Sequence, residues 1–488
     1  MAFFGRTPIF SDVAKIDRTN VVAVLNDALS THYKNAAEID ALYKIYRGDQ
    51  AILQRTKNIR PDIVDNVVVN KAYEIVSFKT SYLLNKPITY VNRSTTEDYV
   101  DEINVLNDYM FLENKTTHDK EIADDFSITG VAYRAVFPNK NAATGDSPFK
   151  IYTLSPSCTF LIRKSSMEQE VLAGVTYVQK LDGEITYNVY TPERYFVIEG
   201  GVIISEQPTI LGEVPIIEYV NNTFRLGAFE VVVGLLDKIN VVESNRIEAT
   251  EQTVQSITWF NNVDIPEGDV EKLKERPSAF IFTTTADGAA GADIKQIETN
   301  LNQSDQQVLI NDLIKRVLEI TGMPSIGDGM TSDSSNNGST IVRNGWYNAE
   351  ARANDSEKLW RSSEREFLKI VLKICKMSKY SDIDIPLYAI EEKFTRRNYE
   401  DIMTKSTVLT TLLGCEKIHP MTAYQVAGLS PDSDSAYKLG MEWYENENKK
   451  QQKQLDQMEE EKNGTAAGTA EESYQAEQPG GTNDRVGA

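Results

Sequence analysis

Oxygen-bearing side chains gather in one short run of the sequence, Asp333-Ser334-Ser335-Asn336-Asn337-Gly338. Alternating oxygen ligands followed by a glycine are typical of the loop that binds Ca²⁺ between two helices. That loop needs a bidentate glutamate at its twelfth position, where this sequence has Asn344. It also follows its first helix directly, whereas the helix predicted here ends earlier, at Gly322. We therefore interpret the run as part of a polar loop and expect no metal site.

Motifs of the common enzyme classes are absent from the sequence. It has no G-x-x-x-x-G-K-[ST] phosphate loop, no H-E-x-x-H zinc motif and no G-x-S-x-G nucleophile motif. Its histidines, His32, His118 and His419, are far apart, and no cysteines accompany them at metal-ligand spacing. Adjacent acidic residues, such as Asp124 and Asp125, diverge on a helix and indicate a solvated surface. We expect neither catalysis nor a cofactor.

Composition limits the class of protein. A chain of 488 residues, with 41% hydrophobic and 25% charged residues, can fold as two or more structural units. The odd number of cysteines, Cys158, Cys375 and Cys415, without a C-x-x-C pair, is typical of a reducing compartment. No apolar run approaches the roughly 20 residues that a membrane-spanning helix needs. We expect no contact with a membrane.

The net charge of −21 limits contacts with nucleic acid. Proteins that grip DNA gain affinity from lysines and arginines that neutralise phosphates and release counterions. The acidic balance therefore argues against tight general binding of DNA. It does not exclude a protein that surrounds DNA without holding it.

Helical and strand periods alternate in the first half of the chain. Apolar spacing predicts a helix that ends at Gly48, a helix between Asn70 and Pro87, and a helix over residues 97–126. From residue 130 to 219 the period changes to two, which predicts a meandering antiparallel β region. The predicted strands cover residues 131–138, 149–155, 159–164, 171–179, 184–191 and 194–200.

Two helices and an insert follow the β region. A helix over residues 227–259 should form a rod of roughly 45 Å, and a second helix should cover residues 304–322. Between them we expect a compact insert with a short helix at 271–276 and two strands. The insert separates two helices with apolar stripes, which predicts that the second helix returns along the first.

The last part of the chain is predicted to be a loop, two helical regions and a tail. Gly, Ser, Thr, Asn and Asp dominate residues 323–340, which indicates a mobile loop. A very long helix should cover residues 341–377, and a smaller helical unit residues 399–445. From residue 449 the composition is rich in Glu, Gln and Gly, so we expect a helix that frays into disorder.

Two motifs near the N-terminus resemble the signature of tailed-phage portal proteins, in the branch found in many Gram-positive siphophages. They read YKIYRGDQAILQR and VVVNKAYEIVSFKTSYLLNKPITY. The likeness also includes residues 235–240 and 337–340 and extends over about 400 residues, without the final 40 or so. The tripeptide Arg47-Gly48-Asp49 then lies in a helix–turn–helix, and no secretory signal supports an adhesion role. The matching positions are Tyr43, Tyr46, Gly48, Ile52, Asn70, Ala72, Ile75, Val76, Lys79, Leu83, Leu84, Pro87 and Tyr90.

The resemblance implies an α+β subunit that assembles as a ring, usually of twelve copies. The subunit would have a mixed α/β wing, a two-helix stem, a small α/β clip, a long bridging helix and a helical crown. Mapped onto this sequence, the parts are wing 1–225, stem helices 226–260 and 304–322, clip 261–303, tunnel loop 323–340, bridging helix 341–384, crown 385–448 and a disordered acidic tail 449–488.

A ring of this kind implies partners and a location. The portal would be a conduit for double-stranded DNA, which passes through without tight binding. The clip would meet the terminase large subunit during packaging and a head-completion or adaptor protein afterwards. The wing and stem would meet the major capsid protein and the scaffold protein. The expected location is the portal vertex of the virion, with assembly in the host cytoplasm.

Candidate site residues fall into three groups. Apolar stripes on the stem helices would pack subunits together, although a monomeric helical hairpin remains the alternative. Basic residues on the same helices could line the channel, although ordinary solvated surface residues explain them as well. The tunnel-loop candidates are Ser325, Asp328, Met330, Asp333, Asn336, Asn337 and Arg343; the stem-channel candidates are Lys238, Arg246, Lys315 and Arg316; the packing candidates are Phe229, Val233, Leu236, Leu309, Leu313 and Val317.

Two other classes of protein remain open from the residues alone. One is a minor head or scaffold protein that binds only proteins and forms no ring. The other is an uncharacterised enzyme that uses acidic residues, with residues 323–340 as a lid. Particles with a central hole would separate the portal from both.

Overall fold

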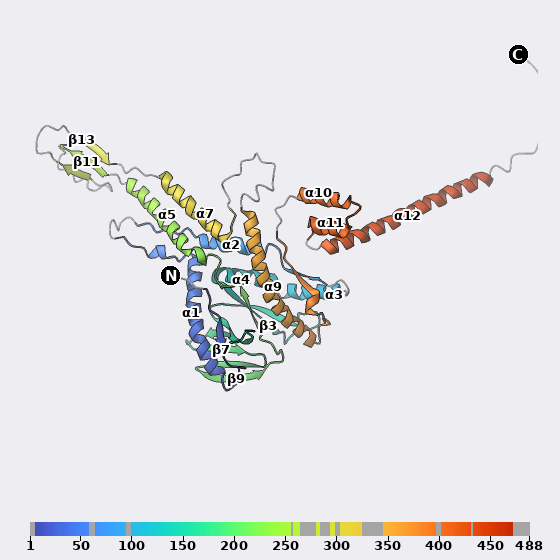
Figure 1. Ribbon diagram of the computed structural model, residues 1–488, viewed down its shortest axis with the longest axis horizontal. Coiled ribbons are helices and arrows are strands. Elements are labelled where there is room, and N and C mark those ends of the chain that lie inside the picture. Colours follow the sequence, from blue (N-terminus) through green and yellow to red (C-terminus); the bar gives the residue numbers. More distant parts are fainter. Residues whose placement is uncertain are drawn as a thin grey trace, which may run out of the picture. The chain divides into compact units, whose positions relative to one another are not determined.

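The computed structural model describes residues 5–57, 64–93, 99–254, 257–263, 280–283, 293–297, 303–324, 345–396, 402–430 and 433–471. The chain divides into two compact units, Met1–Arg397 and Asn398–Ala488 (Figure 1). Helices and several small sheets share the first unit, whereas the described part of the second is helical. The predicted α+β class is confirmed.

Local signals place the first helices. Helix α1 (Val21–Arg47) ends at Gly48, whose φ of 92° is in the left-handed region that favours glycine. A short 3₁₀ helix, Ala51–Gln54, follows. The Asn70 side chain caps α2 (Lys71–Leu83) by accepting a hydrogen bond of 3.3 Å from the Tyr73 N–H. Both predicted helix limits, at Gly48 and Asn70, are confirmed.

The predicted helix over residues 97–126 is wrong in one respect, because the chain forms two helices there. These are α3 (Val100–Leu112) and α4 (Lys115–Thr129). Asn114 lies between them with a φ of 52°, which breaks the helical backbone. Both helices are amphipathic, so the apolar pattern in the sequence continues past Asn114. The break between the helices is visible only in the backbone conformation.

The meander is confirmed in a six-stranded sheet, where β5 to β9 pair in sequence order. The first two predicted strands, β3 and β4, instead form a separate sheet with β10, in the order β10-β3-β4. A period of two identifies strands but not their partners. The bounds are β1 Ile9–Ser11 (parallel to β5), β3 Val131–Pro138, β4 Phe149–Leu154, β5 Thr159–Lys164, β6 Val171–Gln179, β7 Ile185–Tyr190, β8 Arg194–Glu199, β9 Val202–Pro208 and β10 Ile216–Val220.

Two helices cover these sheets. Helix α1 packs on the six-stranded sheet through a cluster that includes Leu25, Leu29 and Phe160. Helix α9 (Trp346–Met377) packs on the β10-β3-β4 sheet, with Trp360 and Phe367 in the largest buried cluster. The predicted long helix is confirmed from Trp346 to Met377, whereas residues 341–344 lie outside the described part of the chain.

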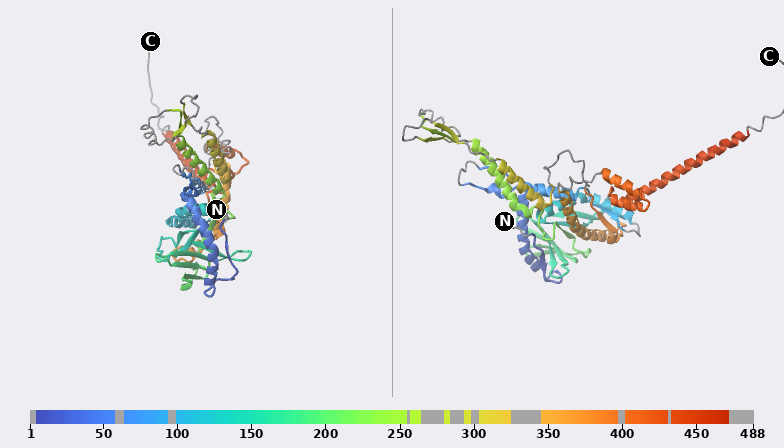
Figure 2. Two further views of the ribbon diagram at one scale, coloured as in Figure 1. Left: turned by 90° about the vertical axis from the view of Figure 1, so that its left-hand side faces the viewer. Right: turned by 45° about the horizontal axis from the view of Figure 1, so that its top comes forward.

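The predicted helix over residues 227–259 is too long at both ends. A 3₁₀ turn (Glu230–Val232) leads into α5 (Val233–Val254), and Ile257–Asn261 form strand β11. The 22 residues of α5 span roughly 33 Å rather than 45 Å. Helix α7 (Gln303–Thr321) packs along α5, as Figures 1 and 2 show.

The insert between α5 and α7 contains a small sheet that begins earlier than predicted. Its strands are β11, β12 (Phe280–Thr283) and β13 (Asp293–Ile297), in the order β12-β11-β13. Strand β11 runs parallel to β12 and antiparallel to β13. The helix predicted at residues 271–276 lies outside the described residues.

The expected start of the crown at residue 385 does not coincide with the division of the chain into two units. Residues 385–396 were expected to open the crown, but β14 (Ile390–Lys393) pairs with β2 (Thr89–Asn92) of the first unit. Ile383, Ile385 and Ile390 extend the core of that unit, which explains why the chain divides only after Arg397.

The second unit contains three helices in its described part: α10 (Ile402–Leu413), α11 (Pro420–Ala427) and α12 (Ser433–Glu471). Helix α12 continues well past residue 449, where disorder was expected, because Glu, Gln and Lys are good helix formers even without apolar partners. Residues 472–488 lie outside the described part. Among the helices that the structure describes, none combines the length and apolarity of a membrane span.

Candidate channel and subunit-contact residues

The basic residues of α5 and α7 differ in their solvent exposure and in the polar partners that they already have. Arg246 is held inside the helix pair, where Nε donates to Gln303 Oε1 at 2.6 Å and Nη1 donates to Gln307 Oε1 at 2.8 Å. Arg316 forms an exposed ion pair of 3.0 Å with Asp312. Lys238 and Lys315 are exposed. Arg246 therefore joins the two helices, and the two lysines are the better candidates for a channel lining.

Most apolar residues expected to pack subunits together are buried within one chain. Phe229, Leu236 and Val317 are at most 2% exposed and belong to a cluster with α2 residues such as Ile75. Val233 and Leu313 pack against the same cluster. Their burial therefore needs no neighbouring subunit. Leu309 is different, because it is 47% exposed.

This difference predicts opposite effects for two charge substitutions. Leu236→Asp should lower the free energy of unfolding by more than about 4 kcal/mol, because it places a carboxylate in the core. Leu309→Asp should leave the fold intact and prevent assembly if its helix face meets another copy. Circular dichroism measures the first effect and mass photometry the second.

Ser304→Asp is the matched control, since it adds the same charge at an exposed position of the same helix. A Leu309→Asp protein that assembles like this control would remove Leu309 from the subunit contact.

Polar side chains spaced four residues apart anchor α5 to an earlier segment. Asn240, Ser244 and Glu248 are buried on one face of the helix. Each of them accepts one hydrogen bond from a backbone N–H, and the three donors are every second residue from 65 to 69. Four residues of a helix rise roughly 6.0 Å, and two residues of an extended chain span roughly 6.7 Å. Successive side chains on α5 are therefore spaced nearly as far apart as successive N–H donors on the extended segment. The bonds run from Val69 to Asn240 Oδ1 at 2.8 Å, from Val67 to Ser244 Oγ at 3.0 Å and from Asp65 to Glu248 Oε1 at 3.3 Å.

The sequence analysis missed this ladder. Polar residues at positions four apart look like an exposed helix face, but here they lie against a backbone that needs hydrogen-bond partners. Lys57 and Arg55 contact the Glu248 carboxylate as well. The middle of α5, from Asn240 to Glu248, is thus fixed to residues 55–57 and 65–69 by polar contacts, in addition to the apolar cluster.

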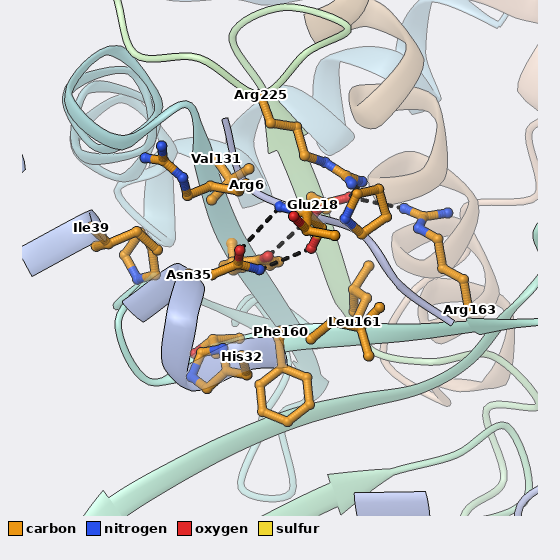
Figure 3. A pocket seen from close by; sticks show the side chains of 16 residues that line it. Arg6, His32, Asn35, Ile39, Val131, Phe160, Leu161, Arg163, Glu218 and Arg225 are labelled. Carbon is orange, nitrogen blue, oxygen red and sulfur yellow. Dashed lines mark hydrogen bonds and ion pairs between the residues drawn. The ribbon is translucent and has the colours of Figure 1, made fainter. Parts of the chain in front are cut away.

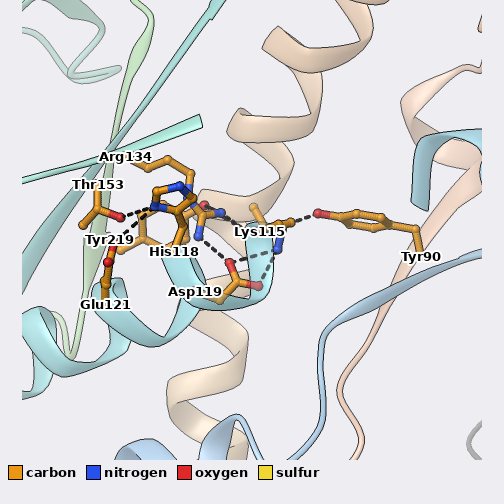
Figure 4. A network of polar contacts seen from close by, with 9 residues as sticks. Tyr90, Lys115, His118, Asp119, Glu121, Arg134, Thr153 and Tyr219 are labelled. Atoms are coloured by element: carbon orange, nitrogen blue, oxygen red, sulfur yellow. Dashed lines mark hydrogen bonds and ion pairs between the residues drawn. The ribbon is translucent and has the colours of Figure 1, made fainter. Parts of the chain in front are cut away.

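A neutral network of four buried charges fixes α9 to the sheets, as Figure 4 shows for most of its members. Glu364 of α9 pairs with Lys115 at 2.8 Å and with Arg134 at 3.3 Å, and Asp119 pairs with both cations. The hydroxyls of Tyr90 and Tyr219 donate to the two oxygens of Glu364 at 2.5 and 2.8 Å. Burial would raise the pKa of Glu364, but Lys115 and Arg134 outweigh it and lower the pKa to about 2. Glu364 is therefore ionised and structural.

A second group of buried charges holds the N-terminal segment (Figure 3). Glu218 accepts from Arg225 at 2.7 Å and from Arg163 at 3.0 Å. Burial favours a raised pKa for Glu218, but the two guanidinium groups lower it. Arg6 pairs with Glu230 at 2.7 Å, next to the start of α5. Each charge here has a partner, so the hollow in Figure 3 has the features of a packing site rather than a reactive one.

The expected tunnel-loop residues lie outside the described part of the chain. This holds for Ser325, Asp328, Met330, Asp333, Asn336, Asn337 and Arg343, and for the calcium-like run. Their role stays a prediction. Among the residues that the structure does describe, no group of three or more His, Cys, Asp or Glu side chains could hold a metal ion.

Comparisons with known proteins bear on these surfaces. A family model described as "Phage portal protein, SPP1 Gp6-like" matches residues 27–467, about nine tenths of the chain and parts of both units. No curated protein matches the chain. Among solved structures, a chain of the "Neck of native GTA particle computed with C12 symmetry" aligns with a TM-score of 0.39 and 11% identity, and the alignment covers 74% of this chain and 90% of that one.

Proposed function

Since this chain belongs to the SPP1 Gp6-like family of phage portal proteins, we propose that its copies close into a ring at one capsid vertex. The ring is the conduit for double-stranded DNA during packaging and ejection. The observation that carries the proposal is the family match over residues 27–467. Twelve copies is the number that the family resemblance implies.

The parts of the subunit then take separate roles. Helices α5 and α7 form the stem around the channel, and the β12-β11-β13 sheet at their far end forms the clip. The clip meets the terminase large subunit, and later a head-completion or adaptor protein. Residues 1–225 form the wing, which together with the stem meets the major capsid protein and the scaffold protein, and α9 belongs to the bridging helix. The chain supplies no ATP chemistry, because its sequence lacks a phosphate loop.

Charge supports a conduit rather than a clamp. DNA must slide through the ring, so the wall should neutralise few phosphates. Residues 323–340 contain Asp328 and Asp333 and no lysine or arginine, and Arg246 is occupied between the stem helices. Lys238 and Lys315 remain as exposed cations that could attract DNA locally.

Deletion of residues 325–338 tests the conduit role. The deletion joins the end of α7 to the region before α9 and leaves the buried clusters untouched. We expect rings to assemble normally and heads to package or retain little DNA, measured as the fraction of DNA-filled heads in micrographs. A deletion of similar length in the C-terminal tail, residues 475–488, serves as the control. Normal DNA-filled heads from the loop deletion would contradict the proposed role of this segment.

A further inference from the structure

A groove of about 590 Å³ lies between the β10-β3-β4 sheet and the six-stranded sheet. Residues of β3, β4 and the loop that joins them form one side, and residues of β6 and β7 form the other. The two sheets pack together through a buried cluster that includes Tyr133 and Leu161. At the margin of this cluster Phe137, Leu154 and Tyr190 are only partly buried, so the groove begins where the contact between the sheets ends.

Aromatic side chains line the groove along an edge strand. The ring centroid of Phe137 lies 6.0 Å from that of Tyr152, which is 45% exposed, and 5.2 Å from that of Tyr190. In the described part of the chain β4 pairs with β3 alone. Lys150, Tyr152 and Leu154 line the groove from alternate positions of β4, so the groove follows this strand. An extended segment of about four residues, which spans roughly 13 Å, matches this length of the strand.

The groove is positively charged, although the chain as a whole carries a net charge of −21. Lys140 and Lys150 line it and are exposed, and none of the other residues that line it is charged. Neither lysine forms a hydrogen bond or an ion pair with a residue that the structure describes. The loop that carries Lys140 is held in place, because the Asn139 side chain donates to the Ser147 carbonyl at 3.0 Å. Aromatic surface beside two available cations is complementary to a ligand with apolar and acidic groups.

We propose that this groove binds an extended acidic segment of another protein. One aromatic or aliphatic side chain of the segment packs against Phe137 and Tyr152, and its carboxylates lie beside Lys140 and Lys150. The groove belongs to residues 1–225, so the assignment of the partner to the phage head rests on the proposed function, whereas the binding chemistry does not.

Charge favours another protein over DNA and over a second copy of this chain. A nucleic acid gains affinity from each phosphate that a cation neutralises, and only two cations line this groove. A second copy carries the same net charge of −21, so its approach is opposed overall. A partner protein needs to bring only one acidic segment, and an apolar side chain anchored in the groove would supply most of the affinity.

The first arm of the test measures how the full-length protein binds a short peptide. The probe is a fluorescein-labelled heptapeptide with a central phenylalanine and three glutamates on each side, and its fluorescence polarisation is followed as protein is added. The Lys140→Glu/Lys150→Glu double variant should weaken binding by about tenfold or more, and Tyr152→Ala should also weaken it. The matched control, Lys34→Glu/Lys86→Glu, reverses two exposed lysines outside the groove and should bind like the natural chain. No binding by the natural chain, or equal binding by the two double variants, would overturn the proposal.

The second arm uses two further probes to identify the class of ligand. A heptapeptide with alanine in place of the phenylalanine should bind more weakly, by about fivefold or more, because it lacks the apolar anchor. Equal binding of the two peptides would overturn the role of the aromatic side chains. If a labelled oligothymidylate binds in a way that depends on Lys140 and Lys150 and the peptide does not, the acidic segment is overturned and a nucleic acid takes its place.

The third arm measures assembly of the same variants by mass photometry. The Lys140→Glu/Lys150→Glu double variant should assemble like the natural chain, because the proposed occupant is another protein. A loss of assembly in this variant alone would overturn that occupant in favour of a second copy. If the natural chain binds the peptide but never assembles, the proposed ring fails and the groove remains.

Discussion

Replacing Glu364 with alanine is expected to lower the free energy of unfolding by about 3–5 kcal/mol. The side chain is fully buried and is the shared acceptor for Lys115, Arg134, Tyr90 and Tyr219. Its removal leaves two cations with one remaining carboxylate, Asp119, in a buried site. Urea denaturation, followed by circular dichroism, measures the loss.

The control for this prediction lies on the same helix. Asp355 pairs with Lys358 at 2.9 Å, but their side chains are 69% and 74% exposed, so Asp355→Ala should change stability little. Similar losses for Glu364→Ala and Asp355→Ala would show that burial of the network contributes nothing.

Acid adds an independent signature of the same network. The folded pKa of Glu364, about 2, lies below the ordinary value of 4.5, so its contribution is complete above pH 4.5 and is lost as the pH falls toward 2. The stability difference between the natural chain and Glu364→Gln should therefore shrink over that range. A difference that stays constant would contradict the ionised state of Glu364 in the fold.

Gly130→Ala is expected to cost about 2–6 kcal/mol, for two reasons that add. Gly130 has a φ of 88°, which alanine rarely adopts, and an added Cβ would lie 2.1 Å from the Arg225 carbonyl oxygen. That overlap is with backbone, which cannot rotate away. Gly130 contacts the backbone of Arg225 where the chain runs from the sheets to α5. At the same place the Ala228 N–H donates to the Ser127 carbonyl oxygen at 2.7 Å.

Gly183→Ala separates the two reasons. Gly183 also has a φ of 88°, but no heavy atom lies within 4 Å of an added Cβ. Its cost should therefore reflect the backbone alone and be clearly smaller than that of Gly130→Ala in the same denaturation experiment. Equal losses of stability for Gly130→Ala and Gly183→Ala would mean that the contact between Gly130 and Arg225 tolerates a side chain.

Local signals explain which parts of the fold were predictable. Gly48, Asn70 and Gly322 mark helix ends through backbone conformation or a side-chain cap, which depend on neighbouring residues only. The period of two identified most strands for the same reason. The break at Asn114 was hidden because the helices on both sides keep an amphipathic pattern.

Contacts between distant residues explain what the sequence left out. Strand β14 pairs with β2, which lies about 300 residues earlier in the chain, so residues 385–396 belong to the first unit, which the sequence pattern did not predict. Lys115, Asp119 and Glu364 have the residue types of a solvated surface, and only the fold shows that they neutralise one another inside it. Likewise, Leu236 and Val317 are buried by their own chain.

Electron micrographs of the purified full-length protein test the central claim most directly. Negatively stained particles, recorded over a range of protein concentrations and ionic strengths, should be annular with a stain-filled centre wide enough for a duplex. Their mass should be a fixed multiple of 54.8 kDa. Compact monomers under all of these conditions, or solid particles without a central hole, would contradict a portal ring and favour a minor head or scaffold protein that forms none.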